Sequence, residues 1–327
     1  MKMLTRQDSP VPVWAQNERQ GGQRRRGRWS RYSSRTFYLF IAPWVTGFLV
    51  LTVLPLVYAF LMSFTNFDGM SAHWHWIGLQ NYAELLHDAD VWASLLRTML
   101  YTVITVPLSV AAGLGLALLL NQRLHAVGFF RTVFYLPSVV PVVASAVIWK
   151  LIFDRDAGAL NAIIERLGGP TITWLIDPTV FYALIILVMW GVGGGMIIML
   201  AGLQGIPGEL HEAAKIDGAT AWQAFRTVTL PMLSPVLFFQ VVTGVIYSLQ
   251  TYVQPLLLAQ NNGAASVVSV PASNRLYMIT AVQQFLYNQR FGYGSAMLWV
   301  LFLLVLGITL LVFRSSSFWV YYEVERD

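Results

Sequence analysis

Apolar residues gather in six long runs along the chain, separated by shorter polar segments. The runs cover residues 37–64, 99–120, 132–149, 179–203, 232–259 and 294–313. A helix of about 20 apolar residues crosses the roughly 30 Å hydrocarbon layer of a bilayer. The pattern therefore predicts an all-α, polytopic membrane protein with six transmembrane helices.

The composition supports this interpretation. Hydrophobic residues make up 56% of the 327 residues and charged residues 11%, whereas soluble domains carry about 25% charged residues. A soluble surface could not be solvated with so few charges, so an unusually apolar soluble enzyme is disfavoured. The absence of cysteine excludes disulfides, thiolate metal sites and cysteine nucleophiles.

The polar segments divide the chain into three parts. We expect a basic cytoplasmic tail without regular structure at 1–36, a six-helix domain at 37–314 with a polar helical loop at 204–231, and a cytoplasmic tail at 315–327. The first tail carries nine of the 21 Lys and Arg residues. Nucleic acid is one conceivable partner for such a tail, but contact with anionic lipid beside a membrane span is the favoured interpretation.

Basic residues in short loops predict the orientation of the helices. The tail before the first span is strongly basic, loop 65–98 holds four acids and one arginine, and loop 121–131 holds two arginines and no acid. This distribution places both termini in the cytoplasm and loop 204–231 on the same side. Loop 260–293 runs against it, because an external loop should not carry Arg275 and Arg290 without any acid.

The six apolar runs contain no Asp, Glu, Lys, Arg or His. Ion-coupled transporters, proton pumps, intramembrane hydrolases and buried metal sites all need such groups at depth. The chain also lacks the glycine-rich, lysine-containing loop that holds nucleotide phosphates. A solute that crosses here is therefore expected to be neutral, and its transport is expected to draw energy from another chain.

Uncharged polar residues in the fifth run could recognise such a solute. They recur every three or four positions, which places them on one face of a continuous helix: Gln240, Thr243, Tyr247, Gln250 and Gln254, with Thr251 and Tyr252 beside them. We expect them to line a water-filled path, although bonding between neighbouring helices would also explain them. In the fourth run, Trp190 precedes a glycine-rich stretch that either breaks the helix at a substrate site or allows close packing.

The polar loop predicts two short helices. Pro207 can begin the first, Gly218 can end it in a left-handed conformation, and Thr220 with Gln223 has the spacing of a capping box. Pro231 is expected to end the second helix and to begin the fifth span. Helices this short need a docking surface, which is either another subunit or the chain's own bundle.

The spacing of the loop resembles a known family. The motif Glu212-Ala213-Ala214, three residues, Gly218, nine residues, Val228, one residue, Leu230-Pro231 is similar to the EAA loop of bacterial ABC-importer permeases, with Val228 where isoleucine is usual. The segments FRTVFYLPSVVP, IWKLIF…GALN and FGYGSAMLWVLF resemble the carbohydrate-uptake branch, in particular its maltose/glycerol-phosphate-type first permease.

The resemblance implies a function and a set of partners. A sugar would cross the bacterial inner membrane by alternating access, delivered by an extracytoplasmic solute-binding protein, and this chain would pair with a second permease. A cytoplasmic ABC ATPase dimer would bind ATP and Mg, so this chain would be no enzyme and would hold no cofactor. Its ATPase-coupling residues would be Glu212, Ala213, Ala214, Asp217, Gly218, Trp222 and Phe225.

Two alternatives remain at this point. The same machine could carry a glycerol-phosphate-type or other polar solute, although a phosphate should favour basic residues or a helix N-terminus at depth. A membrane enzyme or a receptor is the more remote alternative. It is disfavoured because the spans hold no ionisable group and because the chain shows no sizeable soluble sensing domain.

Overall fold

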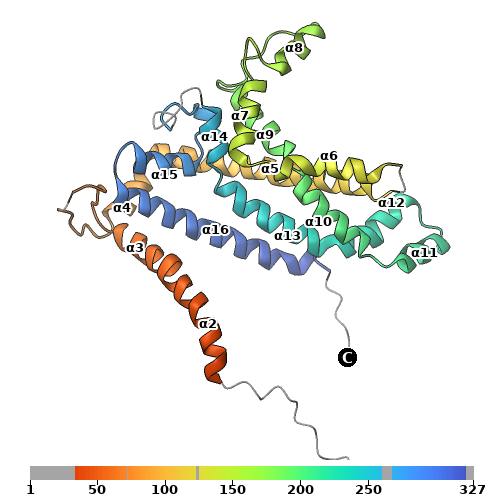
Figure 1. The fold of residues 1–327 in the computed structure, drawn as a ribbon, viewed down its shortest axis with the longest axis horizontal. Helices are drawn as coiled ribbons and strands as arrows, with labels where there is room; N and C mark the ends of the chain where they lie inside the picture. Colours follow the sequence, from red (N-terminus) through yellow and green to blue (C-terminus); the bar gives the residue numbers. More distant parts are fainter. Residues whose placement is uncertain (1–33, 72, 123–124, 260–266, 322–327) are drawn as a thin grey trace, which may run out of the picture. The chain divides into compact units, whose positions relative to one another are not determined.

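A computed structural model describes residues 34–71, 73–122, 125–259 and 267–321. Within these residues the regular elements are helices, and the β-structure is one isolated bridge between Thr65 and Trp76. The predicted all-α class is confirmed (Figure 1). The helices are α2 (Ser34–Phe48), α3 (Leu54–Met62), α4 (Gln80–His87), α5 (Ala89–Leu120), α6 (Val127–Val139), α7 (Val142–Ile152), α8 (Ala159–Arg166), α9 (Thr179–Trp190), α10 (Gly193–Gln204), α11 (Gly208–Ile216), α12 (Ala221–Ala224), α13 (Leu230–Leu249), α14 (Val253–Leu258), α15 (Tyr277–Leu286) and α16 (Phe291–Trp319).

The chain forms two compact units, residues 1–58 and 59–327. The described part of the first unit consists of α2, a π-helical turn at Leu49–Val53 and the start of α3. Phe40 and Leu51 are almost fully exposed here, as expected for a helix whose apolar side chains face lipid. The remaining elements all belong to the second unit.

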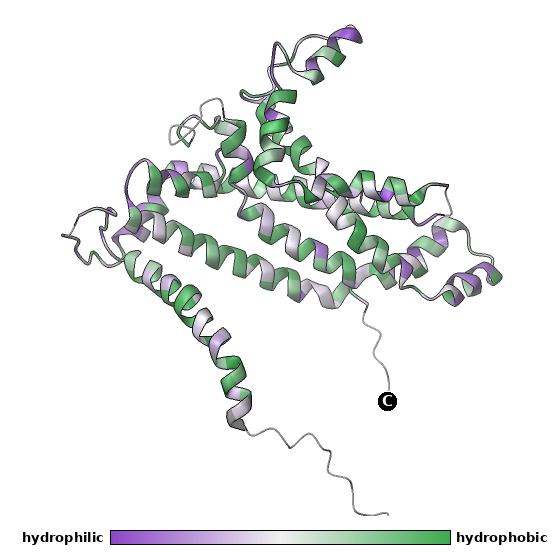
Figure 2. Ribbon diagram, viewed as in Figure 1, coloured by the Kyte–Doolittle hydropathy of each residue, from purple (hydrophilic) through white to green (hydrophobic). Residues whose placement is uncertain are grey.

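Four helical stretches are each long and apolar enough to cross a membrane: Thr36–Met62, Ala89–Leu120, Ala221–Leu249 and Phe291–Trp319. Two further pairs, α6 with α7 and α9 with α10, meet the same test when each bent pair is taken as one span. The described residues thus hold up to six spans, in agreement with the six predicted. Figure 2 shows these helices as largely hydrophobic, with hydrophilic residues at α8 and α11.

The third predicted span is not one straight helix. It divides into α6 and α7, whose axes differ by 99°. The break falls at Val140, which is extended (φ −68°, ψ 129°), directly before Pro141. A proline ring disfavours the α conformation of the preceding residue, so the local sequence explains the bend.

The fourth span bends by 43° between α9 and α10, at Gly191 and Val192. The glycine run therefore does break the helix, as one of the two interpretations held. Close packing is present too: a Cβ added at Gly193 would lie 1.9 Å from the carbonyl oxygen of Phe134 on α6. Because only glycine allows this approach, the first turn of α10 is held against α6.

Pro231 does not end the second loop helix, contrary to the prediction. The stretch Ala221–Leu249 is continuous, and a π-helical turn at Phe225–Thr229 precedes the proline. The Leu230 amide bonds to the carbonyl of Phe225, five residues back. Such a turn is wider than an α turn, and it accommodates a ring that would otherwise clash with the preceding turn. The π turn at Leu49–Val53 precedes Pro55 in the same way.

The fifth span ends earlier than predicted, so the polar stripe does not lie on one helix. α13 stops at Leu249 and α14 begins at Val253. In a continuous helix Pro255 would clash with the preceding turn, whereas in the first turn of α14 its missing N–H costs nothing. Gln254 therefore belongs to α14, and Gln250 and Tyr252 lie in the link between the two helices.

Candidate functional site: a polar loop hairpin and an uncharged cavity

The polar loop forms the two predicted helices. α11 begins directly after Pro207 and ends at Ile216, and Gly218 has the left-handed φ of +77° that its position suggested. The Gln223 amide donates to Thr220 Oγ1 at 3.3 Å, and the Thr220 amide donates to Gln223 Oε1 at 2.8 Å. Both bonds of the capping box are thus present, and they fix the entry into α12.

Two side-chain contacts lie within the hairpin, one inside its second helix and one between its two halves. The rings of Trp222 and Phe225 stack with centroids 5.4 Å apart, and His211 Nε2 lies 3.4 Å from the hydroxyl of Thr229. The second contact joins α11 to the π turn, and the sequence interpretation did not anticipate it. Since α11 has nine residues and a helix of that length is unstable alone in water, such contacts help to stabilise it.

Most of the predicted coupling residues are on the surface of the hairpin. Glu212, Ala213, Asp217, Gly218 and Trp222 are exposed, whereas Ala214 and Phe225 are partly buried. Ile216 is 86% exposed and was not among the predicted residues. The hairpin therefore presents large apolar side chains, Ile216 and Trp222, among charged ones.

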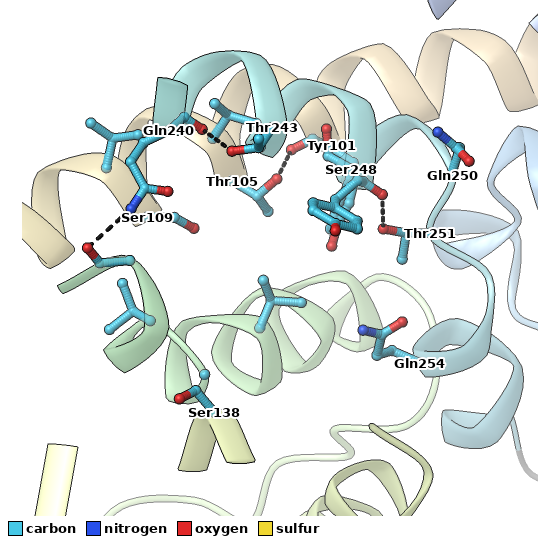
Figure 3. A pocket seen from close by; sticks show the side chains of 18 of the residues that line it. Tyr101, Thr105, Ser109, Ser138, Gln240, Thr243, Ser248, Gln250, Thr251 and Gln254 are labelled. Carbon is cyan, nitrogen blue, oxygen red and sulfur yellow. Dashed lines mark hydrogen bonds between the residues drawn. The ribbon is translucent and has the colours of Figure 1, made fainter. Parts of the chain in front are cut away.

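A cavity of about 940 Å³ lies between α5, α6, α7, α9, α10 and the α13–α14 segment (Figure 3). Six of the seven residues predicted for the substrate path line it, although they do not share one helix: Gln240, Thr243, Tyr247, Gln250, Tyr252 and Gln254. The break after α13 turns the last of them towards the same space. Volumes of this order are typical of pockets that bind small molecules.

Trp190 is not among the residues that line this cavity, which corrects its assignment to the substrate path. Its ring packs edge-on against Trp149 of α7, with centroids 6.0 Å apart. The bend after α9 leaves this side chain in a packing contact between two spans, while Gly191 and Val192 reach the cavity instead.

The cavity also has a wall that the sequence interpretation missed. Tyr101, Thr105 and Ser109 of α5 line it, together with Ser138 of α6. The α5 residues are four positions apart and so share one helix face. The same periodicity argument that singled out the fifth run would have found them.

Among the described residues that line the cavity, none is Asp, Glu, Lys, Arg or His. Its polar groups are amides, hydroxyls and phenols. Several hydroxyls and amides bond to carbonyls earlier in their own segment: Thr243 Oγ1 donates to Phe239 at 2.8 Å, and Thr251 Oγ1 donates to Tyr247 at 3.1 Å. Their oxygen lone pairs stay able to accept bonds, so the wall suits a neutral, hydroxyl-rich solute better than an ion.

Comparison with known proteins gives a consistent picture. Residues 109–326 match the model of the family described as binding-protein-dependent transport system inner membrane component. A probable ABC transporter permease protein of Bacillus subtilis is 37% identical over 294 residues, which is 89% of this chain and 93% of that protein.

The names of several relatives mention sugars. The trehalose/maltose transport system permease protein of Thermococcus litoralis is 33% identical over 286 residues, covering 86% of this chain and 93% of that protein. The lactose transport system permease protein of Rhizobium radiobacter is 32% identical over 293 residues, covering 88% and 95%. Among solved structures, a chain of a bacterial alginate ABC transporter in complex with an alginate pentasaccharide-bound periplasmic protein shares the fold, with a TM-score of 0.74 at 19% identity over 93% of this chain and 96% of that one.

Proposed function

Because the chain belongs to the family of binding-protein-dependent transport system inner membrane components, we propose that it is a permease subunit of an ABC importer for a neutral sugar. The observation that carries the proposal is the cavity of about 940 Å³, in which the described lining residues include no charged side chain. The names of the sugar-transporting relatives support the same class of solute.

The cavity would bind the sugar through amides, phenols and hydroxyls. Gln240 and Gln254 can bond to sugar hydroxyls, and the rings of Tyr247 and Tyr252 can stack on the apolar faces of a pyranose. Tyr247 is 77% exposed and lines the cavity, so its ring is accessible to a solute. An uncharged site of this kind has no ionisable side chain that could take up and release a coupled proton.

The energy would come from a cytoplasmic ATPase that docks on the hairpin of α11 and α12. The exposed side chains of Ile216 and Trp222 supply apolar contacts for a groove in that partner. Movement of the hairpin would pass into α10 and α13, which continue from its two ends, and would alternate access to the cavity. ATP and Mg would be bound by that ATPase, with both termini of this chain on its side of the membrane.

An ABC importer of this kind would require two further partners. A second permease would complete the path, and an external binding protein would deliver the sugar, as the family description implies. A glycerol-phosphate-type solute is the second candidate, but the cavity offers no Lys, Arg or His to a phosphate. A membrane enzyme would also need ionisable groups that this lining does not have.

The test is uptake into proteoliposomes that contain the chain with its second permease, ATPase and binding protein. Labelled maltose, trehalose and lactose would be compared with glycerol 3-phosphate. We expect a neutral sugar to be taken up, and Tyr247→Ala and Gln254→Ala each to lower its uptake by roughly 2- to 12-fold, the effect of one neutral contact. Uptake of glycerol 3-phosphate alone, or sugar uptake that neither variant alters, would contradict the proposal.

A further inference from the structure

Two helices connect the cavity with the hairpin. α10 runs from the bend at Val192 to Gln204 and reaches α11 through residues 205–207, whereas α13 continues from the hairpin through the π turn. Both helices line the cavity, α10 with Gly195 and α13 with Gln240. A contact between these two residues would connect α10 and α13, the two helices that lead into and out of the hairpin, beside the space for the solute.

Such a contact exists. Gln240 Nε2 donates to the carbonyl oxygen of Gly195 at 3.0 Å, across 45 residues of sequence (Figure 3). The amide of Gln250 differs in this respect, since it bonds to the carbonyl of Ile246 four residues earlier. Gln240 thus uses its amide to hold a neighbouring helix rather than its own.

The glycine at the acceptor position leaves room for the amide of Gln240. A Cβ added at Gly195 would lie 3.2 Å from Gln240 Nε2, which is too close for an undisturbed amide. Two residues earlier, Gly193 holds the same turn of α10 against the backbone of α6. The Gly195 carbonyl therefore has a defined position just beyond the bend in the span.

We propose that Gln240 transmits the presence of the solute to the hairpin. While Nε2 holds the Gly195 carbonyl, the amide oxygen Oε1 accepts a hydrogen bond from a hydroxyl of the sugar in the cavity. An amide is able to do both, since it carries two donors and an acceptor. The sugar, α13 and α10 then become one hydrogen-bonded unit, and solutes without a hydroxyl donor at this position are selected against. This inference rests on the proposed function.

Three variants test the N–H donor and the oxygen acceptor of the Gln240 amide. Gln240→Met keeps the length of the side chain and removes donor and acceptor. Gln240→Glu keeps an acceptor but removes the N–H that holds Gly195, and Gly195→Ala displaces the amide from the other side. The control is Gln283→Met, the same chemical change at a partly buried glutamine of α15 that lines neither this cavity nor the small apolar pocket beside Gln250.

The assembled transporter provides two readouts. The first is the factor by which binding protein loaded with maltose, trehalose or lactose raises ATP hydrolysis. The second is hydrogen–deuterium exchange of residues 193–204 in the absence of sugar. We expect Gln240→Met to lower the stimulation factor by roughly 2- to 12-fold, the effect of one neutral hydrogen bond. We also expect faster exchange of α10 in all three variants and no change in the control.

The outcomes distinguish this inference from the proposed function. If sugar stimulates the wild-type complex and Gln240→Met and Gly195→Ala behave as wild type in both readouts, the role of Gln240 is refuted. If no sugar stimulates the wild-type complex, the proposed function fails, and the exchange of α10 alone decides the contact. Unchanged exchange in Gln240→Met would then refute it as well.

Discussion

Arg290, directly before α16, forms a two-pronged ion pair with Glu84 of α4. Nη1 lies 2.8 Å from Oε1, and Nη2 lies 2.6 Å from Oε2. The guanidinium also lies 4.3 Å above the ring of Tyr293, whose hydroxyl donates to Asp88 Oδ2 at 2.9 Å. Asp88 in turn caps the first turn of α5.

This network gives an acidic partner to Arg290, one of the two arginines that ran against the predicted orientation. Loop 260–293 carries no acid of its own, but Arg290 pairs with an acid from loop 65–98. The two loops therefore lie on the same side of the bundle, and the charge of Arg290 is balanced by that of Glu84. Counting charges loop by loop could not reveal this balance, because the partner lies more than 200 residues away.

The ion pair predicts a measurable coupling between its partners. Its side chains are 42% and 48% exposed, so solvent screening limits its strength. In a double-mutant cycle with Glu84→Gln and Arg290→Gln, we expect a coupling energy of about 0.5–1 kcal/mol. Thermal unfolding in detergent at low salt would measure it, and the coupling should shrink as salt is added. Strictly additive variants at low salt would show that the pair contributes nothing.

Because Gly218 is left-handed, the stability cost of a substitution there should depend on how well the new residue tolerates a positive φ. It should not depend on the size of the new side chain. No atom of the described residues lies within 4 Å of a Cβ added there, so the cost of substitution comes from the φ of +77°. Gly218→Ala and Gly218→Arg should destabilise the turn by about 1–2 kcal/mol, and Gly218→Asn by less, since asparagine tolerates this conformation.

The consequence of the Gly218 variants is expected in function rather than in membrane insertion. Uptake and sugar-stimulated ATP hydrolysis should be lost in Gly218→Arg while the amount of protein in the membrane is kept. Gly208→Ala is the matched control, because it adds a Cβ to open space at a helical position of the same hairpin. Normal transport by Gly218→Arg would argue against a role of the hairpin in coupling.

A substitution of Gly193 is expected to disrupt the packing of α10 against α6. A Cβ at this position would overlap the carbonyl oxygen of Phe134, so Gly193→Ala must separate α10 from α6, at a cost of about 3 kcal/mol. We expect little monodisperse protein after solubilisation, as judged by size-exclusion chromatography. Gly115→Ala in α5 adds the same methyl group where no atom lies within 4 Å, and it should leave the yield unchanged.

Asp177 predicts a dependence of stability on pH at the N-terminal end of α9. Partial burial raises the pKa of its carboxyl, but hydrogen bonds from the Ser273 side chain and from the amides of Ser273 and Ala272 together lower it by more. The pKa of Asp177 therefore lies below its ordinary value of 3.8. The two amides donate at 2.8 Å each. A lowered pKa means that the folded state favours the charged carboxylate.

The resulting stabilisation is fully present above pH 3.8, the ordinary value, and is lost as the pH falls through the lower folded-state pKa. We expect Asp177→Asn to reduce the melting temperature near neutral pH and to flatten its decline below about pH 4. Thermal unfolding of both proteins between neutral and acidic pH would measure this. Parallel curves for the two would show that the carboxylate is not responsible.

The sequence by itself determined the features that depend on near neighbours. The all-α class, the number of spans, the turn at Gly218 and the capping box of Thr220 and Gln223 could all be predicted, because hydrophobic periodicity and capping act within about four residues. The bend before Pro141 and the early end of α13 before Pro255 belong to the same class. Their local cause is present in the sequence, although the prediction of continuous spans missed them.

Only the tertiary structure decided which side chains meet. It placed Gln254 of α14 and Tyr101 of α5 around one cavity and turned Trp190 into a packing contact with Trp149. It also paired Gln240 with Gly195 and Arg290 with Glu84. These contacts depend on the angles at which helices cross and break. Those angles arise from the packing of many side chains far apart in the chain, which no short window of sequence contains.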